Sequence, residues 1–342
     1  MSGWSGAGAA ALMLALTGCG GSDGAIRITG SSTVHPFTQA VSEAFAAQQA
    51  GRTAPAVDSI GTGQGIAAFC AGGGDDTPDI ADASRRITRA EFDACQRNGA
   101  GPIMEVSIGR DGVALAEAAA GPHLTLSRKD IYLALAAMPM GHPNTARTWR
   151  DVDPRLPALP IKVLGPSATS GTHDQLLQLL IEPGCVQANP AAQAMMAQTD
   201  QSAFNQLCRA VRTDGVYVVG GEDYAATAQA VGRDAQAIGV FGYSYLESAH
   251  QLQGLAIDGV APDQGTIANG TYPGGRTLML YVKIAHLKNK PDLQAFLNLY
   301  ATMWNPGGPL TRRGLIAMSD SARQAAQTAI ANGEALDREA LF

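Results

Sequence analysis

A repeated pattern of short apolar runs, polar turns and helical periodicity constrains the fold of this chain most strongly. Residues 26–29 have the composition of a β-strand, residues 30–33 form a polar turn, and apolar residues then recur at helical spacing over 37–45. The same order of strand, polar segment and helix returns within residues 161–181. Alternation of this kind is typical of α/β proteins, whose functional residues often occupy the turns between strand and helix. We therefore predict an α/β fold.

Two segments are predicted to cross between two domains. A chain of 342 residues is longer than one typical domain, so about two domains are expected. Residues 107–115 form a strand long enough to pass from one domain to another, and residues 275–283 alternate like a second strand. We predict two lobes joined by these crossover strands. Residues 26–115 and 278–342 would form the first lobe, and residues 116–277 the second.

The N-terminal residues have the features of an export signal. Residues 7–16 are small and apolar, but ten residues rise only about 15 Å as a helix, half the thickness of a bilayer's hydrocarbon core. Leu-Thr-Gly before Cys19 and the tether at 20–25 after it resemble a bacterial lipoprotein signal, in which the cysteine carries the lipid. We expect residues 1–19 to form this signal, and the mature protein to be periplasmic and anchored to a membrane through Cys19. The alternative is an apolar tail with a free thiol.

The other four cysteines favour an oxidising compartment. They are Cys70, Cys95, Cys185 and Cys208, an even number without Cys-x-x-Cys spacing or the nearby histidines of a zinc site. Among the three possible pairings we favour Cys70–Cys95 and Cys185–Cys208, because these cysteines are nearest neighbours in the sequence. Each disulfide would contribute roughly 3 kcal/mol through chain entropy and would leave motion between the lobes free. Four buried free thiols are the alternative.

The charge balance and the polar segments together indicate the kind of ligand. A net charge of −6 lacks the basic excess of a nucleic-acid scaffold, so we expect no nucleic-acid binding. Free N–H groups at helix N-termini attract anions, and hydroxyls, glycines and arginine support such binding. A single serine or threonine before a helix is more often only an N-cap, so the prediction of an oxyanion site depends on four segments occurring together. These segments are Gly30-Ser31-Ser32-Thr33, Gly61-Thr62-Gly63-Gln64-Gly65, Ala83-Ser84-Arg85-Arg86 and Ser170-Gly171-Thr172-His173-Asp174.

As an ordered set, these segments are similar to the periplasmic phosphate-binding proteins of Pst ABC transporters. The similarity includes Asp79-Ile80-Ala81-Asp82 and Gly239-Val240-Phe241-Gly242-Tyr243-Ser244, and it extends over residues 26–283. The resemblance implies a type II periplasmic binding protein fold that holds inorganic phosphate between its lobes and delivers it to the permease subunits of an ABC transporter. It implies a monomer that is not an enzyme and has no cofactor or metal. The expected ligand-binding residues are Ser31, Ser32, Thr33, Thr62, Asp82, Ser84, Arg85, Ser170, Gly171, Thr172 and His173.

Two acid–base features set expectations for this ligand. His173 stands where the family pattern has an arginine, and imidazole is charged only below its pKa of about 6.5. We therefore expect ligand affinity to rise as the pH falls from about 8 to 6, and His173→Arg to bind more tightly. Asp82 and Asp58 flank the predicted site. A buried carboxylate there would accept the proton that phosphate carries and sulfate lacks.

Two other functions are compatible with the sequence. The same fold could bind another oxyanion or an organic solute, because several positions depart from the family pattern: His35, Ile60, Gln64, Asp82 and His173. A secreted hydrolase would use Ser170, His173 and Asp174, but these residues share one predicted helical turn and no G-x-S-x-G motif occurs. We therefore favour a ligand-binding function over a hydrolase.

Overall fold

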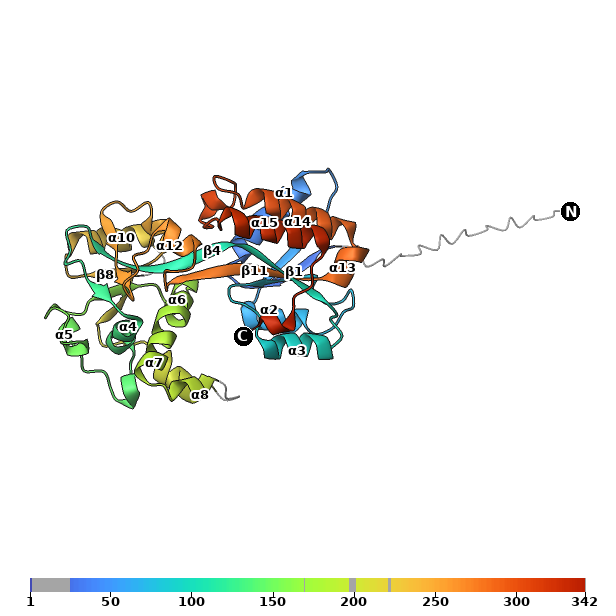
Figure 1. Cartoon of the computed structure of the whole chain (residues 1–342). Coiled ribbons are helices and arrows are strands. Elements are labelled where there is room, and N and C mark those ends of the chain that lie inside the picture. Colours follow the sequence, from blue (N-terminus) through green and yellow to red (C-terminus); the bar gives the residue numbers. More distant parts are fainter. Residues whose placement is uncertain (2–24, 169, 197–200, 221–222, 342) are drawn as a thin grey trace.

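The computed structural model describes residue 1 and residues 25–168, 170–196, 201–220 and 223–341. The predicted export signal and Cys19 lie outside this part of the chain. Figure 1 shows two lobes joined by two long strands, β4 (Ile103–Ala118) and β11 (Gly275–Lys283). The predicted α/β fold is confirmed. Within the described ranges, no helix is both long and apolar enough to cross a membrane.

One path of paired strands runs through both lobes in the order β2-β1-β3-β11-β4-β8-β6-β7. The remaining strands on this path are β1 (Arg27–Gly30), β2 (Ala56–Ser59), β3 (Ile80–Ala83), β6 (Val163–Gly165), β7 (Tyr217–Val219) and β8 (Ile238–Gly242). Strand β4 is shared: residues 103–112 pair with β11, and residues 113–117 pair with β8. We call the part around β1, β2, β3 and β11 the first lobe, and the part around β6, β7 and β8 the second lobe. The residue boundaries predicted for the lobes stay a prediction.

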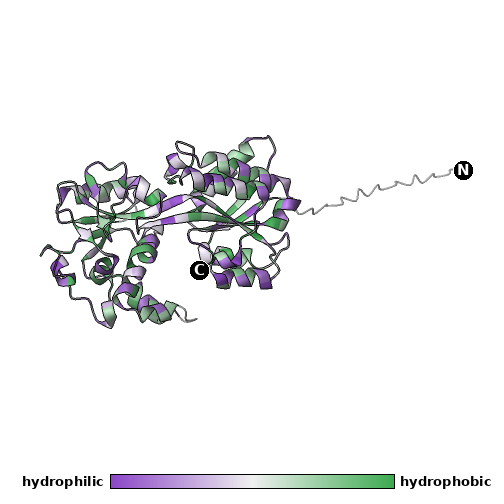
Figure 2. Cartoon of the chain, in the orientation of Figure 1, coloured by the Kyte–Doolittle hydropathy of each residue, from purple (hydrophilic) through white to green (hydrophobic). Residues whose placement is uncertain are grey.

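Helices cover both faces of the first-lobe sheet. Helices α1 (His35–Ala47), α14 (Pro291–Met303) and α15 (Asp320–Asn332) pack on one face, and α2 (Thr62–Phe69) and α3 (Arg89–Arg97) on the other. The apolar residues predicted at helical spacing lie in α1, where Phe45 packs edge-on against Phe296 at 5.6 Å between ring centroids. Figure 2 shows green, apolar strands between helices that carry purple, hydrophilic residues. The polar turns therefore stay at the strand ends, where the predicted site residues lie.

The second lobe has its own core around Tyr132 and Trp149. Its first helices are α4 (Arg128–Leu135), α5 (Trp149–Val152), α6 (Gly171–Gln175), the π-helical segment Leu176–Ile181 and α7 (Glu182–Ala188). They are followed by α8 (Ala192–Met196), α9 (Ser202–Cys208), α10 (Tyr224–Arg233), α11 (Tyr243–Leu246) and α12 (Gln264–Ala268). The short strands β5 (Thr125–Leu126) and β10 (Ala256–Ile257) pair with each other, and β9 (Leu252–Gly254) pairs with β4. After β11 the chain continues into α13 (Ile284–Asn289), which packs in the core of the first lobe.

Two disulfides are present, Cys70–Cys95 and Cys185–Cys208, as predicted. The first joins the end of α2 to α3, and the second joins α7 to α9. Each therefore links two helices of one lobe, and neither crosses between the lobes. Both leave the two crossing strands as the covalent connection between lobes.

Removing Cys70–Cys95 by a Cys70→Ser, Cys95→Ser double substitution is expected to lower the free energy of unfolding by about 3 kcal/mol, because the bond closes a loop in the unfolded chain. Urea unfolding monitored by circular dichroism measures this change. The Cys185→Ser, Cys208→Ser protein is the matched control, because the sequence separations, 25 and 23 residues, are nearly equal. A loss below about 1 kcal/mol for both proteins would contradict the chain-entropy argument.

Candidate anion-binding site

The predicted first-lobe residues gather where β1 and β3 end and α2 begins. The hydroxyl oxygen of Thr62 accepts the N–H of Ser84 at 3.1 Å, and the two hydroxyl oxygens lie 3.1 Å apart. The N–H of Ser31 donates to the carbonyl of Asp82 at 2.9 Å, which joins the ends of β1 and β3. Thr62 is also the first residue of α2, where free backbone N–H groups and the helix dipole favour an anion. We call Ser31, Ser32, Thr33, Thr62, Ser84 and Arg85 the first cluster.

Two glycines allow these segments to approach each other. A Cβ on Gly30 would lie 2.1 Å from the carbonyl oxygen of Asp82, and Gly30 has a φ of +142°, which side chains disfavour. A Cβ on Gly65 would lie 2.3 Å from the Cα of Gly30. Only glycine fits these positions, so the N-terminal turn of α2 can pack directly against the end of β1. This close packing explains why glycine occupies positions 30 and 65 of the sequence motifs.

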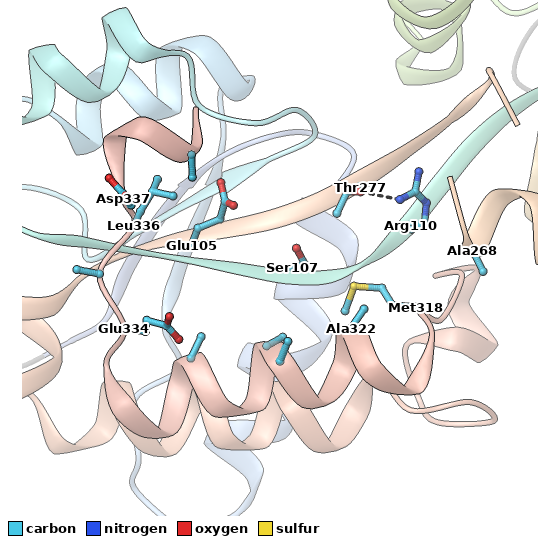
Figure 3. A pocket seen from close by; sticks show the side chains of 15 residues that line it. Glu105, Ser107, Arg110, Ala268, Thr277, Met318, Ala322, Glu334, Leu336 and Asp337 are labelled. Atoms are coloured by element: carbon cyan, nitrogen blue, oxygen red, sulfur yellow. Dashed lines mark hydrogen bonds between the residues drawn. The ribbon is translucent and has the colours of Figure 1, made fainter. Parts of the chain in front are cut away.

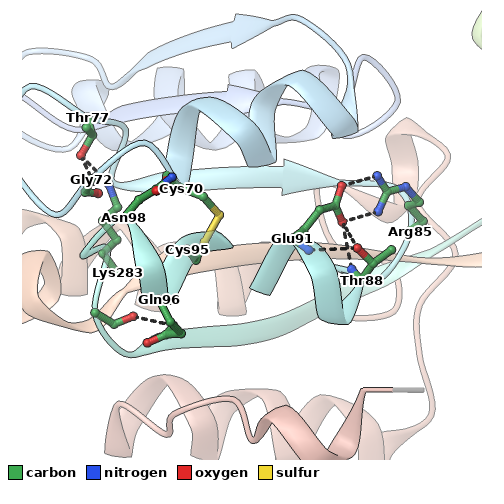
Figure 4. The surroundings of a disulfide bond; sticks show 11 residues. Cys70, Gly72, Thr77, Arg85, Thr88, Glu91, Cys95, Gln96, Asn98 and Lys283 are labelled. Carbon is green, nitrogen blue, oxygen red and sulfur yellow. Dashed lines mark hydrogen bonds and ion pairs between the residues drawn. A yellow bond between two sulfur atoms is a disulfide. The ribbon is translucent and has the colours of Figure 1, made fainter. Parts of the chain in front are cut away.

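The Arg85 guanidinium forms an ion pair with Glu91, a residue that the sequence analysis did not include in the site. Its guanidinium donates to both carboxylate oxygens of Glu91 at 2.9 and 2.7 Å (Figure 4). Glu91 also accepts the N–H of Thr88 in the capping box that starts α3. These hydrogen bonds raise the pKa of Arg85 and lower that of Glu91. A Cβ on Gly63 would lie 3.8 Å from Arg85 Nη2, so the guanidinium is close to the start of α2.

The predicted second-lobe residues form the start of α6. The Ser170 hydroxyl accepts the N–H of Thr172 at 3.3 Å and so caps the helix. The Thr172 and Tyr224 hydroxyl oxygens lie 2.5 Å apart, and the Tyr224 ring packs edge-on against Phe241. Phe241 belongs to the Gly-Val-Phe-Gly motif of β8, so this motif supports the helix start from behind. We call Ser170, Gly171, Thr172 and His173 the second cluster.

The His173 side chain lies in the interior of the second lobe. It is 8% exposed, its ring packs edge-on against Tyr217 at 6.3 Å between centroids, and Nδ1 has no hydrogen-bond partner among the described residues. Burial lowers its pKa; the charge of Arg209 also lowers it, and that of Asp174 raises it. An arginine in its place would bury a second positive charge near Arg209. His173→Arg is therefore expected to destabilise the fold, which would work against the tighter ligand binding predicted for it. The role of His173 as a ligand stays a prediction.

His173 is expected to make the fold less stable in acid. Because its folded pKa lies below 6.5, the unfolded chain takes up a proton that the folded chain rejects, so stability falls as the pH drops from about 7 to 5. His173→Gln should show a smaller fall, measured by urea unfolding at both pH values. The exposed His250 provides the control, since His250→Gln should keep the wild-type fall. Identical falls in wild type and His173→Gln would contradict this assignment.

The structure places Asp82 and Asp58 differently from the sequence expectation. Asp82 is 1% exposed; a hydrogen bond from Thr38 of α1 reaches its side chain, and the Thr38 hydroxyl oxygen lies 3.1 Å from that of Tyr300. Burial raises the pKa of Asp82 to about 8, against the lowering effect of Thr38. Asp58 is exposed on β2, so the expectation of a buried carboxylate there is wrong. The proposed proton-accepting role of Asp82 stays a prediction.

Both clusters connect to the crossing strands through residues that the sequence analysis missed. Arg276 of β11 donates to the Thr33 hydroxyl at 2.7 Å and lies 3.7 Å from the Asp111 carboxylate of β4. Asp111 accepts a hydrogen bond from the Gln175 side chain of α6. We call Thr33, Arg276, Asp111 and Gln175 the bridge. A signal existed in the sequence: the otherwise apolar crossover segments carry the charged residues Arg110 and Asp111 in the first, and Arg276 and Lys283 in the second.

Two buried polar atoms of the bridge have no hydrogen-bond partner in the described residues. Arg276 is 7% exposed, and its Nε and the Gln175 Oε1 are buried without a hydrogen-bond partner in the described residues. Burial lowers the pKa of Arg276 and raises that of Asp111, and each charge opposes the shift of the other. Buried polar atoms without partners are rare and call for one. The arrangement suits an oxyanion that accepts from Arg276 and the two clusters. No group of three or more histidine, cysteine or acidic side chains in the described ranges could hold a metal ion.

Comparisons with known proteins agree with this arrangement. A family model described as "PBP superfamily domain" matches residues 17–302. Protein SphX of Synechocystis sp. is 27% identical over 337 residues, 95% of this chain and 88% of that protein. The phosphate-binding protein PstS of Staphylococcus saprophyticus is 26% identical over 303 residues, 84% of this chain and 81% of that protein. The crystal structure of a possible phosphate binding protein from Planctomyces limnophilus is 25% identical, with a TM-score of 0.69, and the match covers 90% of this chain and 98% of that one.

Proposed function

Because the chain belongs to the PBP superfamily, we propose that it is a periplasmic solute-binding protein that binds inorganic phosphate between its lobes and delivers it to an ABC importer. The relatives named PstS and the possible phosphate binding protein of similar structure support phosphate as the ligand. Solute-binding proteins of this family are not enzymes. We further propose that the protein acts as a monomer and is anchored through Cys19.

The bridge is the observation that carries this proposal. It joins Thr33 of the first cluster to Gln175, which follows the second cluster on α6, through a buried arginine and a partly buried aspartate. Phosphate would accept from the hydroxyls of Thr62 and Ser84, from the α2 and α6 N-terminal N–H groups, and from Arg276. In the described residues β4 and β11 are the covalent connections between the lobes, so a hinge motion about these strands would bring both clusters onto the ligand. Binding and closure are therefore coupled.

Calorimetry with phosphate, sulfate and arsenate, on protein freed of ligand by a denaturing wash and refolded, tests the proposal. We expect saturable phosphate binding with one site per chain. Thr62→Val and Thr172→Val remove one hydroxyl from each cluster, and each is expected to weaken binding about five- to tenfold. Thr53→Val changes an exposed threonine outside the clusters and should bind like wild type.

Three outcomes would contradict the proposal. Absence of phosphate binding by a folded protein would exclude phosphate, and preferential binding of sulfate would assign another oxyanion to the same site. Wild-type affinity in both threonine variants would place the ligand elsewhere. Small-angle scattering adds a test of closure, since saturating phosphate should reduce the radius of gyration.

A further inference from the structure

Arg110 carries a guanidinium charge that no carboxylate in the described part of the chain neutralises. Its Nη1 donates to the Thr277 hydroxyl at 2.9 Å, and its Nε is buried without a partner. The next residue, Asp111, points to the opposite face of β4, because successive side chains of a strand alternate. Burial lowers the pKa of Arg110, with no acid opposing the shift. A partly buried charge without a counter-ion is unfavourable, so an anion bound beside this group would be stabilised.

A cavity of about 510 Å³ lies beside this guanidinium. Figure 3 shows Arg110 and Ala268 at one end, Ser107 and Met318 in the middle, and the acidic side chains at the other end. Those acids are Glu105, Glu334 and Asp337. The volume falls within the range of small-molecule sites. The cavity is thus large enough for an organic ligand rather than a single inorganic ion.

The lining selects the chemistry of that ligand. One wall consists of Met318, which precedes α15, and of alanine methyl groups on that helix. These alanines are Ala322, Ala325, Ala326 and Ala329. A guanidinium binds a carboxylate through two parallel hydrogen bonds. Glu105 at the far end is paired with Arg86. The negative charges that repel a second anion there are therefore those of Glu334 and Asp337. The lining therefore fits one carboxylate attached to an uncharged apolar body.

We infer that this cavity is a second ligand site, which binds a monocarboxylic organic acid with its carboxylate on Arg110 and its apolar body along α15. The site lies on the face of the crossing strands opposite to the bridge, because Arg110 and Thr277 alternate with Asp111 and Arg276 along β4 and β11. It is separate from the proposed phosphate site and does not depend on that proposal.

Titration with hexanoate in phosphate-free buffer tests this site, read by the methyl resonances of ¹³C-methyl-methionine protein. We expect a saturable shift of Met318, which lines the cavity, and no shift of Met140, which is exposed in the second lobe. Arg110→Gln should weaken hexanoate binding at least about tenfold, and Arg110→Lys should weaken it less, because lysine keeps the charge without the fork. Arg313→Gln, which changes an exposed arginine, should bind like wild type.

Hexanol distinguishes the carboxylate from the apolar body. The inference predicts that hexanol binds at least about tenfold more weakly than hexanoate. Equal binding of the two, wild-type binding of hexanoate by Arg110→Gln, or the absence of a saturable Met318 shift would each overturn the site. If Arg110→Gln does not fold, Arg110→Lys and the hexanol comparison still decide. None of these results bears on phosphate binding, which is measured separately.

Discussion

Arg276→Met is expected to lower the free energy of unfolding by about 3 kcal/mol, the lower end of the range for breaking a buried pair, because it leaves the partly buried Asp111 carboxylate without its positive partner. Burial already raises the pKa of Asp111, and the charge of Arg276 gives the largest opposing effect. The substitution also removes the donor to Thr33. Urea unfolding measures the stability, and calorimetry on the same protein should show weaker phosphate binding.

Two control proteins distinguish the loss of the Arg276–Asp111 pair from the general effect of removing an arginine on the free energy of unfolding. Arg155→Met removes a surface ion pair with Asp153, in which the arginine is 86% exposed, and should leave the stability close to that of wild type. Asp111→Asn combined with Arg276→Met removes both charges and should recover part of the loss, because no buried charge remains unpaired. A single variant as stable as wild type, or a double variant less stable than the single one, would contradict the role assigned to the pair.

Asp82→Asn is expected to raise the free energy of unfolding by about 2–4 kcal/mol at pH 7. The carboxyl has a folded pKa of about 8 and a reference value of 3.8, so the unfolded chain releases this proton from about pH 4 upward while the folded chain keeps it until about pH 8. Its contribution to stability is complete below about pH 4 and is lost as the pH rises through this window. Asparagine cannot ionise, so the variant should lack this fall. Urea unfolding at pH 5, 7 and 8 measures the difference.

Asp58→Asn is the matched control, since Asp58 is exposed on a strand of the same sheet. It should follow the wild-type dependence on pH. A wild-type dependence in Asp82→Asn would show that Asp82 ionises freely in the fold. Asp82→Asn also tests the predicted selectivity, because an unchanged ratio of phosphate to sulfate affinity would exclude Asp82 as the acceptor of the phosphate proton.

Features that depend on nearby residues were predictable from the sequence. The strand at 26–29 is found as β1 one residue later, the helical spacing over 37–45 falls within α1, and both disulfides join the nearest cysteines. The Thr62–Ser84 contact joins two predicted turns, which follow β2 and β3; both strands pair in parallel with β1, so their carboxyl ends meet at one edge. Periodicity, glycine turns and short loops act over a few residues, so the sequence contains these signals directly.

The sequence by itself determined the α/β fold and the polar turns, and it gave the prediction of an oxyanion site in the two clusters. Only the tertiary structure decided which charges meet. Thr33 and Arg276 are 243 positions apart and come together because β11 enters the sheet between β3 and β4. The same packing turned Asp82 toward α1 and buried His173 against Tyr217. A side chain's direction depends on strand register and on the helices covering each face, and these are set by long-range pairing rather than by neighbours in the chain.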